Sequence, residues 1–308
     1  MPDIKSFIEL SKFSSAQITD LFQKCLQLKK NFSKNPKASP SLNGTATLLF
    51  FEPSTRTRFS FESAAVRAGV YPLVFSGASG TSLEKGETME DTIMNLEAMR
   101  PLFFVIRAPD SLNLHEIQKK ISVPILNAGW GLRAHPTQAL LDTVTLFEQW
   151  QTLKNKKILF VGDIRHSRVV NSHVELSKMM GYEIGYCGPE NFLPEKLVEQ
   201  GHGKIEMFTN LKEALRWADA VVALRVQKER HSSPSLAMQD YREHYGLNSQ
   251  SLENLKSDAV IMHPGPINYG VEMEENVLQD QRSVILKMVE NGVFMREALI
   301  REVLESIK

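Results

Sequence analysis

Cysteine is scarce in this chain: only Cys25 and Cys187 occur among its 308 residues. The two lie far apart, and neither has a partner at the short spacing that is typical of metal sites. A disulfide framework is therefore excluded as the basis of the fold, and we expect no bound metal. Such sparse cysteine usage is typical of a reduced protein, and we expect the chain to be cytoplasmic.

The chain also lacks an excess of charge of either sign. Lys and Arg together number 36, and Asp and Glu together also number 36, so the formal net charge is zero. Proteins that bind nucleic acid or membrane surfaces generally carry a basic excess, so we expect neither kind of partner. An anionic substrate would have to be bound by local clusters of cationic side chains.

Long apolar runs and a dinucleotide fingerprint are absent as well. No apolar stretch reaches the roughly 18 residues that a membrane span needs, and the N-terminus, with Asp3 and Glu9, has no apolar signal-peptide core. The predicted strand that ends at Val161 is followed by Gly162, but not by the full Gly-x-Gly-x-x-Gly pattern. The sequence therefore argues against a nicotinamide dinucleotide, and we expect no cofactor.

What is present is a regular alternation of strand-like and helical segments. Hydrophobic residues make up 42% of the chain and charged residues 23%, which is normal for a globular protein, and the length suits two domains. The alternation predicts an α/β fold with two doubly wound domains and mostly parallel sheets. We expect a first domain over residues 1–150 that is completed by a C-terminal helix, 291–308, packing back on it. The second domain is expected over residues 151–290.

The predicted elements follow from apolar runs and from helical periodicity. Strands are expected at residues 45–50, 71–75, 102–106, 125–128, 157–161, 183–187, 220–224 and 259–262. Helices are expected at residues 15–30, 60–68, 88–99, 137–149, 167–180, 210–217 and 295–307.

The most informative segment is Phe-Glu-Pro-Ser-Thr-Arg-Thr-Arg at residues 51–58. It lies between a predicted strand and a predicted helix, where backbone N–H groups and the helix dipole favour an anion. One Ser or Thr at such a position is usually only a helix cap. Four polar residues in a row exceed what one cap needs, and three hydroxyls beside a guanidinium indicate a phosphate site. These residues are Ser54, Thr55, Arg56 and Thr57.

The 51–58 motif resembles the carbamoyl-phosphate loop of the aspartate and ornithine carbamoyltransferases. The resemblance implies that Ser54, Thr55, Arg56 and Thr57 hold the phosphate of carbamoyl phosphate. It extends over essentially the whole chain, because further motifs follow in the order of that family.

The polar loop at residues 80–87, Gly-Thr-Ser-Leu-Glu-Lys-Gly-Glu, could by composition be an ordinary exposed turn. In the resembled family, similar loops reach into the active site of a neighbouring subunit. The resemblance therefore implies a homotrimer with shared active sites, in which Ser82 contacts carbamoyl phosphate and Lys85 acts in catalysis and in aspartate binding.

Two further motifs of the first half match the family. Arg107 follows a predicted buried strand, where it could equally be a solvated charge, and a lone histidine such as His135 is usually structural. The sequence His-Pro-Thr-Gln at 135–138, after Asn-Ala-Gly, matches the family and implies specific roles. Arg107 and His135 are expected to bind the carbamoyl oxygen with Thr57, and Gln138 to contact the carbamoyl amide.

The chain departs from the family pattern at two positions in these motifs. Ala108 stands where the family usually has His, and Trp130 stands where it commonly has Asp. Every residue expected to touch the substrates is nevertheless present.

The second half carries the residues that distinguish the second substrate. The segments 161–168 and 225–230 resemble those of aspartate carbamoyltransferases, which implies that Arg168, Arg225 and Gln227 bind aspartate. Ornithine carbamoyltransferases have a Ser-Met-Gly motif, which is absent here. The turn Met-His-Pro-Gly-Pro at 262–266 implies backbone contacts from Gly265 and Pro266, with a cis peptide bond plausible between them.

We therefore expect carbamoyl transfer from carbamoyl phosphate to L-aspartate, an early step of pyrimidine biosynthesis, without a metal or a covalent intermediate. A different amine such as ornithine, or a noncatalytic carbamoyl-phosphate-binding paralogue, remains an alternative. A salt link between Glu52 and Arg230 is a further hypothesis. Additional regulatory or pathway-enzyme subunits are left open by the sequence.

Overall fold

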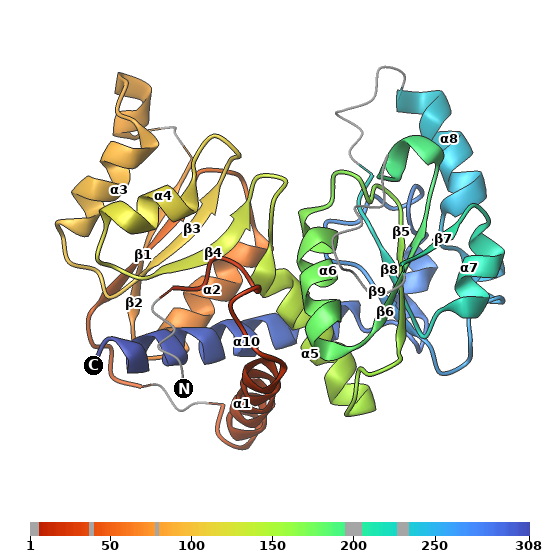
Figure 1. The fold of residues 1–308 in the computed structure, drawn as a ribbon, viewed down its shortest axis with the longest axis horizontal. Coiled ribbons are helices and arrows are strands. Elements are labelled where there is room, and N and C mark those ends of the chain that lie inside the picture. Colours follow the sequence, from red (N-terminus) through yellow and green to blue (C-terminus); the bar gives the residue numbers. More distant parts are fainter. Residues whose placement is uncertain (1–5, 37–39, 78–79, 195–204, 227–233) are drawn as a thin grey trace. The chain divides into compact units, whose positions relative to one another are not determined.

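The computed structural model describes residues 6–36, 40–77, 80–194, 205–226 and 234–308. The chain forms two compact units, one of Met1–Val144 with Val289–Lys308, and the other of Thr145–Met288. Both borders fall within helices. Each unit is an α/β layer structure built on one parallel sheet (Figure 1).

The first unit contains a four-stranded sheet in the order β2-β1-β3-β4, and all its pairings are parallel. Its strands are β1 (Thr45–Phe50), β2 (Tyr71–Ser76), β3 (Phe104–Ala108) and β4 (Ile125–Trp130). Its helices are α1 (Ser15–Lys34), α2 (Arg56–Arg67), η1 (Ser82–Lys85), α3 (Met89–Glu97), α4 (Leu114–Lys120), most of α5 (Pro136–Trp150) and most of α10 (Ile285–Ser306).

The second unit contains a five-stranded parallel sheet in the order β7-β6-β5-β8-β9. Its strands are β5 (Lys157–Val161), β6 (Glu183–Cys187), β7 (Ile205–Phe208), β8 (Ala220–Ala223) and β9 (Val260–Met262). Its helices are α6 (Arg168–Met180), η2 (Glu190–Phe192), α7 (Leu211–Trp217), α8 (Pro234–Tyr245), α9 (Ser249–Leu252) and η4 (Glu275–Gln279).

Burial distinguishes the central strands from the edge strands. In β1, every residue after Thr45 is buried, because helices and neighbouring strands cover it on all sides. In β2, by contrast, Tyr71, Leu73 and Val74 are exposed although the strand is apolar. An uncovered apolar edge strand is a surface to which another chain can bind.

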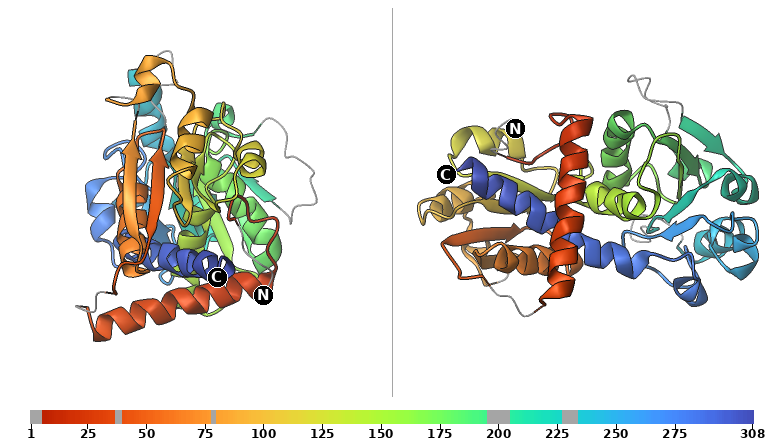
Figure 2. Two further views of the ribbon diagram at one scale, coloured as in Figure 1. Left: turned by 90° about the vertical axis from the view of Figure 1, so that its left-hand side faces the viewer. Right: turned by 90° about the horizontal axis from the view of Figure 1, so that it is seen from below.

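The C-terminal helix α10 belongs to the first unit for most of its length. It crosses α1 in the right-hand view of Figure 2. The ammonium of Lys29 lies 2.9 Å from the Glu290 carboxylate and donates to the side-chain oxygen of Asn291 at 2.7 Å, and Lys24 pairs with Glu302. Phe294, Leu299 and other residues of α10 are buried. These contacts stabilise the return of the chain to the first unit.

The predicted α/β class and the parallel sheets are confirmed, and all eight predicted strands occur. Strand β7 and helices α4, α8 and α9 were not predicted. Helix α2 begins at Arg56 rather than at residue 60, and α10 begins at Ile285 rather than at residue 295. Among the described residues, no helix combines the length and apolar character that crossing a bilayer would require.

Candidate functional site

The candidate residues of the first unit gather at one edge of its sheet. The order β2-β1-β3-β4 reverses direction between β1 and β3, and ligands of open α/β sheets bind at such a switch point, beyond the carboxyl ends of the strands. The 51–58 loop follows β1, and Arg107 lies near the end of β3. The segment containing Ser82 follows β2, and the one containing His135 follows β4.

The phosphate-binding candidates lie in the first turn of α2 and just before it. Thr55 is the residue before the helix, but its hydroxyl makes no cap hydrogen bond, so its side chain does not cap the helix. Arg56 and Thr57 are the first residues of the helix, and Thr57 is buried. Partial burial lowers the pKa of the Arg56 guanidinium. A helix N-terminus with an added cation at this position favours a bound anion.

The neighbouring Arg58 is engaged away from this loop. Its Nε lies 3.2 Å from the carboxylate of Glu62, one turn further along α2, and its guanidinium stacks over the ring of Phe59. Of the two arginines in the motif, Arg56 is therefore the one available to a ligand. Within the described part of the chain, Arg56 has no ion-pair partner.

Arg107 and Glu52 are brought together across the switch point. The Nε of Arg107 lies 3.4 Å from Oε2 of Glu52, and the backbone N–H of Phe51 donates to the carbonyl of Arg107 at 3.0 Å. The side chain of Arg107 is only 14% exposed. The predicted partner of Glu52, Arg230, lies outside the described residues.

His135 and Gln138 lie at the start of α5. The backbone N–H of Gln138 donates to the carbonyl of His135 at 3.0 Å, which places both side chains in the first turn. Both residues are buried, His135 at 5% exposed and Gln138 at 8%. The Nε2 of Gln138 donates to Oδ1 of Asp142 at 2.8 Å, a contact that was not predicted from the sequence. The only indication of this contact in the sequence is that Gln138 and Asp142 are four residues apart on one helix.

Ser82 and Lys85 occupy the short helix η1, and both are exposed. Gly86 ends the helix with a φ of 95°, a left-handed conformation that glycine adopts readily. Their exposure leaves both side chains accessible to another molecule.

The candidate residues of the second unit also lie at a switch point. The order β7-β6-β5-β8-β9 reverses between β5 and β8. Arg168 is the first residue of α6 after β5, and its helix is capped by the Ser167 hydroxyl, which accepts from the N–H of Val170. Arg225 follows β8, on the adjacent strand. Two cations therefore flank one switch point, while Gln227 lies outside the described residues.

The loop after β9 completes this edge of the second sheet. The peptide bond between Gly265 and Pro266 is cis, as predicted. The backbone N–H of Gly265 donates to Nδ1 of His263 at 2.8 Å, so Nδ1 is the acceptor and the ring N–H is on Nε2. That nitrogen faces the buried carboxylate of Glu272 at 3.5 Å, and Glu272 also accepts from the N–H of Asn268 at 2.7 Å. His263 and Glu272 thus hold the loop in shape.

The two departures from the family pattern are neighbours in the structure. Ala108 pairs with Trp130 across the β3–β4 ladder, and both are buried. The indole stacks edge-on against His115, with ring centres 5.5 Å apart, so it fills the core of the first unit rather than the site. The loop beyond it is held by Asp110, whose carboxylate accepts from the N–H of Leu132 at 3.0 Å.

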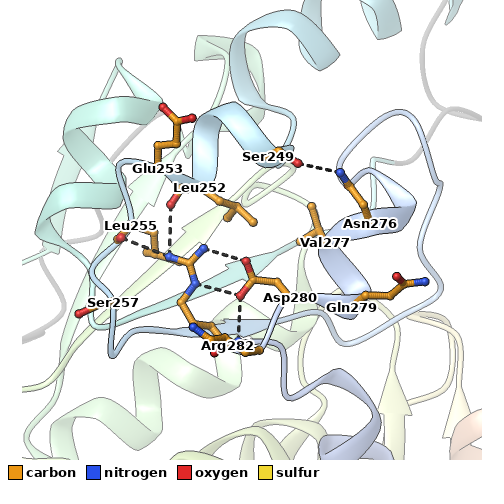
Figure 3. Close-up of a pocket in the computed structure, with 11 residues that line it drawn as sticks. Ser249, Leu252, Glu253, Leu255, Ser257, Asn276, Val277, Gln279, Asp280 and Arg282 are labelled. Carbon is orange, nitrogen blue, oxygen red and sulfur yellow. Dashed lines mark hydrogen bonds and ion pairs between the residues drawn. The ribbon is translucent and has the colours of Figure 1, made fainter.

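The second unit also has an open pocket of about 500 Å³ between α9 and η4 (Figure 3). Its arginine, Arg282, donates to both carboxylate oxygens of Asp280 and to the backbone carbonyls of Leu252 and Leu255. The guanidinium of Arg282 therefore caps the C-terminal end of α9 by hydrogen bonding to these carbonyls. None of the predicted site residues lines this pocket.

The described residues include no group of three or more His, Cys, Asp or Glu side chains arranged to hold a metal ion. The donors gathered at the two switch points are instead guanidinium, hydroxyl, imidazole and backbone N–H groups. Such donors bind phosphate, carboxylate and carbonyl oxygens.

Comparison with known proteins identifies the two halves. Residues 5–148 match the aspartate/ornithine carbamoyltransferase carbamoyl-P binding domain, and residues 154–303 match the Asp/Orn binding domain of the same family. The aspartate carbamoyltransferase catalytic subunit of Chlorobium chlorochromatii is 41% identical over 98% of this chain and 98% of its own length. The corresponding subunit of Prosthecochloris aestuarii is 42% identical over 96% of this chain and 97% of its own length.

Solved structures give the same result. Aspartate transcarbamoylase from Trypanosoma cruzi in complex with carbamoyl aspartate and phosphate superposes with a TM-score of 0.87. The two are 29% identical, and the match covers 97% of this chain and 96% of that chain. The complex of the same enzyme with N-(phosphonacetyl)-L-aspartic acid has a TM-score of 0.83.

Proposed function

The chain belongs to the aspartate/ornithine carbamoyltransferase family, and we propose that it transfers the carbamoyl group of carbamoyl phosphate to the amine of L-aspartate. The products are N-carbamoyl-L-aspartate and phosphate. The observation that carries this proposal is the placement of cations at both switch points. Arg56 and Arg107 lie at the first, where an activated phosphate would bind, and Arg168 and Arg225 lie at the second, where a dicarboxylate would bind.

In the proposed mechanism, Ser54, Thr55, Arg56 and Thr57 hold the phosphate group at the N-terminus of α2. The helix dipole and the Arg56 guanidinium both favour the negative charge that grows on the phosphate as the bond from the carbamoyl carbon to its bridging oxygen breaks. The first turn of α2 thus binds the substrate and stabilises the leaving group.

The carbamoyl oxygen becomes negative when the amine attacks the carbamoyl carbon. Arg107, His135 and Thr57 are proposed to donate hydrogen bonds to it, and Gln138 to contact the carbamoyl amide. Loss of one such donor is expected to raise the barrier by about 3 kcal/mol. The amine attacks in its neutral form, and the departing phosphate is proposed to accept its proton.

The second substrate is proposed to bind through its two carboxylates. Arg168, Arg225, Gln227 and Lys85 are the proposed side-chain ligands, and the backbone at Gly265 and Pro266 contacts the amine. Guanidinium groups bind carboxylates in a planar, two-point geometry, which orients the amine for attack. Ornithine carries an ammonium at its far end and would be repelled by this cationic set.

We also propose a homotrimer with shared active sites. The exposed apolar edge strand β2 offers a surface for association, and Ser82 and Lys85 follow it on exposed η1. Light scattering should give the mass of three chains. Mixing an inactive Lys85→Ala protein with an inactive His135→Ala protein should restore activity, because some mixed sites would then contain neither substitution.

The proposed reaction places the enzyme in pyrimidine biosynthesis. Both cysteines are buried and form no disulfide, which supports a reducing compartment such as the cytoplasm.

Phosphate release from carbamoyl phosphate, measured in parallel with L-aspartate and with L-ornithine, tests the proposed activity. Turnover with aspartate alone is expected. Turnover with ornithine would overturn the assignment of the second substrate, and turnover with neither would overturn the catalytic proposal.

A further inference from the structure

Asp142 is a buried carboxylate directly behind the candidate site of the first unit. It lies one turn beyond Gln138 on α5 and is 0% exposed. A buried carboxylate is costly unless charge and hydrogen bonds compensate for it. Its Oδ1 accepts a 2.8 Å hydrogen bond from Nε2 of Gln138. Its position in the core therefore requires an explanation beyond packing.

The hydrogen bond from Gln138 to Asp142 determines which way the carboxamide points. The group of Gln138 that faces Asp142 is the NH₂, which donates to the carboxyl oxygen Oδ1. The carboxamide oxygen consequently points away from Asp142. This oxygen can accept a hydrogen bond from the NH₂ of a carbamoyl group. If the carboxamide were rotated by 180°, its own NH₂ would face the carbamoyl NH₂, and no hydrogen bond could form between them.

Arg296 is a buried cation that interacts electrostatically with Asp142. It enters from α10, is 3% exposed, and donates from one terminal nitrogen to the Ser60 hydroxyl of α2 at 2.7 Å. Burial lowers the pKa of Arg296 to about 9, while the charge of Asp142 acts in the opposite direction. The guanidinium therefore stays protonated at neutral pH and presents a buried positive charge to Asp142.

The surroundings leave Arg296 little freedom to move. Its guanidinium lies 5.0 Å from the ring centre of Phe61. A side chain at Gly292 would place its Cβ 2.9 Å from the same terminal nitrogen. The three helices α2, α5 and α10 thus meet at one buried polar cluster.

We propose that Asp142 is a positioning residue that fixes the Gln138 carboxamide with its oxygen toward the carbamoyl amide. Asp142 touches no substrate and acts through Gln138. The proposal rests on the proposed function, since it takes carbamoyl phosphate as the ligand of the first unit. It makes a specific prediction about ligand binding, because inorganic phosphate has the phosphate group but no carbamoyl amide.

The test is the effect of Asp142→Asn on two ligands, measured by calorimetry without any amine substrate. Asparagine can donate as well as accept, so it no longer holds the carboxamide in one orientation. We expect affinity for carbamoyl phosphate to fall about tenfold, the equivalent of one lost hydrogen bond, with affinity for inorganic phosphate unchanged. An equal loss for both ligands would indicate a general distortion and would overturn the proposal.

A double-mutant cycle identifies the route of the effect. In a Gln138→Ala background, Asp142→Asn should cause no further loss of carbamoyl-phosphate affinity, because the side chain through which it acts is gone. A further tenfold loss there would overturn the proposal. Asp219→Asn, which removes the partly buried partner of Lys256 in the second unit, is the control and should change neither affinity.

Asp142→Asn leaves Arg296 buried without its counter-charge, so a variant that removes both charges is made alongside it. Asp142→Asn with Arg296→Gln should show the same selective loss of carbamoyl-phosphate affinity. A wild-type protein that binds no carbamoyl phosphate would overturn the proposed function itself. A wild-type protein that binds it, with variants that lose both ligands equally, would overturn only the positioning role.

Discussion

Arg107 and Glu52 form an ion pair at the switch point of the first sheet, with Nε of Arg107 3.4 Å from Oε2 of Glu52. The pair joins the end of β3 to the loop after β1. It holds a guanidinium in place at the position where the carbamoyl oxygen is proposed to become negative.

The first prediction concerns this pair. Glu52→Gln removes the charge that orients Arg107, and we expect kcat to fall by about tenfold or more because the Arg107 donor is no longer pre-organised. Steady-state kinetics with both substrates varied measures the effect. Glu62→Gln, which removes the partner of Arg58 on the same unit, is the control and should leave kcat unchanged. An unaltered kcat in Glu52→Gln would show that Arg107 needs no such orientation.

The second prediction concerns the paired departures Ala108 and Trp130. Restoring the bulkier family residue by Ala108→His crowds a buried position opposite an indole. Such overpacking should lower the free energy of unfolding by about 1–3 kcal/mol, measured by urea denaturation. Combining it with Trp130→Ala should recover part of the loss. The same change at exposed Ala98 is the control, and an equal effect there would contradict the packing explanation.

The third prediction concerns thiol reactivity. Cys25 and Cys187 are both buried, and burial raises the pKa of Cys187 to about 12. At pH 8 only about one Cys187 thiol in ten thousand is then ionised, and the thiolate is the reactive form. A disulfide reagent should therefore label neither cysteine in the native protein and both in urea. Rapid labelling of the native protein would contradict the burial of these residues.

The fourth prediction concerns the pH dependence of stability. Burial raises the pKa of Asp219, but hydrogen bonds from Lys256 and from the backbone N–H of Lys157 outweigh it, and the net shift is downward. A carboxyl with a lowered pKa in the folded state stabilises the fold above its unfolded pKa of about 3.9, and this contribution disappears as pH falls through the folded value.

Asp219→Asn should therefore lower the free energy of unfolding by about 1 kcal/mol at pH 7, the usual worth of such hydrogen bonds. The difference from wild type should shrink below pH 4 in urea titrations. A difference that stayed constant from pH 7 to pH 3 would rule out a contribution from ionised Asp219.

Much of the fold followed from the sequence because apolar runs mark its strands. Ser54, Arg107 and His135 lie at or beyond the ends of strands, and their place at one sheet edge could be expected because parallel strands end at the same edge. The β7 strand was missed because it has only four residues, with the exposed Met207 among them.

Long-range contacts account for the other misses. The beginning of α10 at Ile285 was not predicted, because Asn291 and Gly292 look like a helix break. In the structure, the lack of a side chain at Gly292 leaves space for the guanidinium of Arg296, which lies one turn further along α10. Asp142 was likewise overlooked, because its buried surroundings include Arg296, which lies more than 150 positions further along the chain.

The return of α10 to the first unit has a consequence for how the protein is made. Ribosomes release the N-terminus first, so a typical N-terminal domain folds while the remainder is still being synthesised. Here residues 289–308 supply buried core of the first unit, including Phe294, Leu299 and the Arg296 cluster. The first unit must therefore wait until residues 289–308 have left the exit tunnel, whereas the second unit, residues 145–288, is complete in sequence before then.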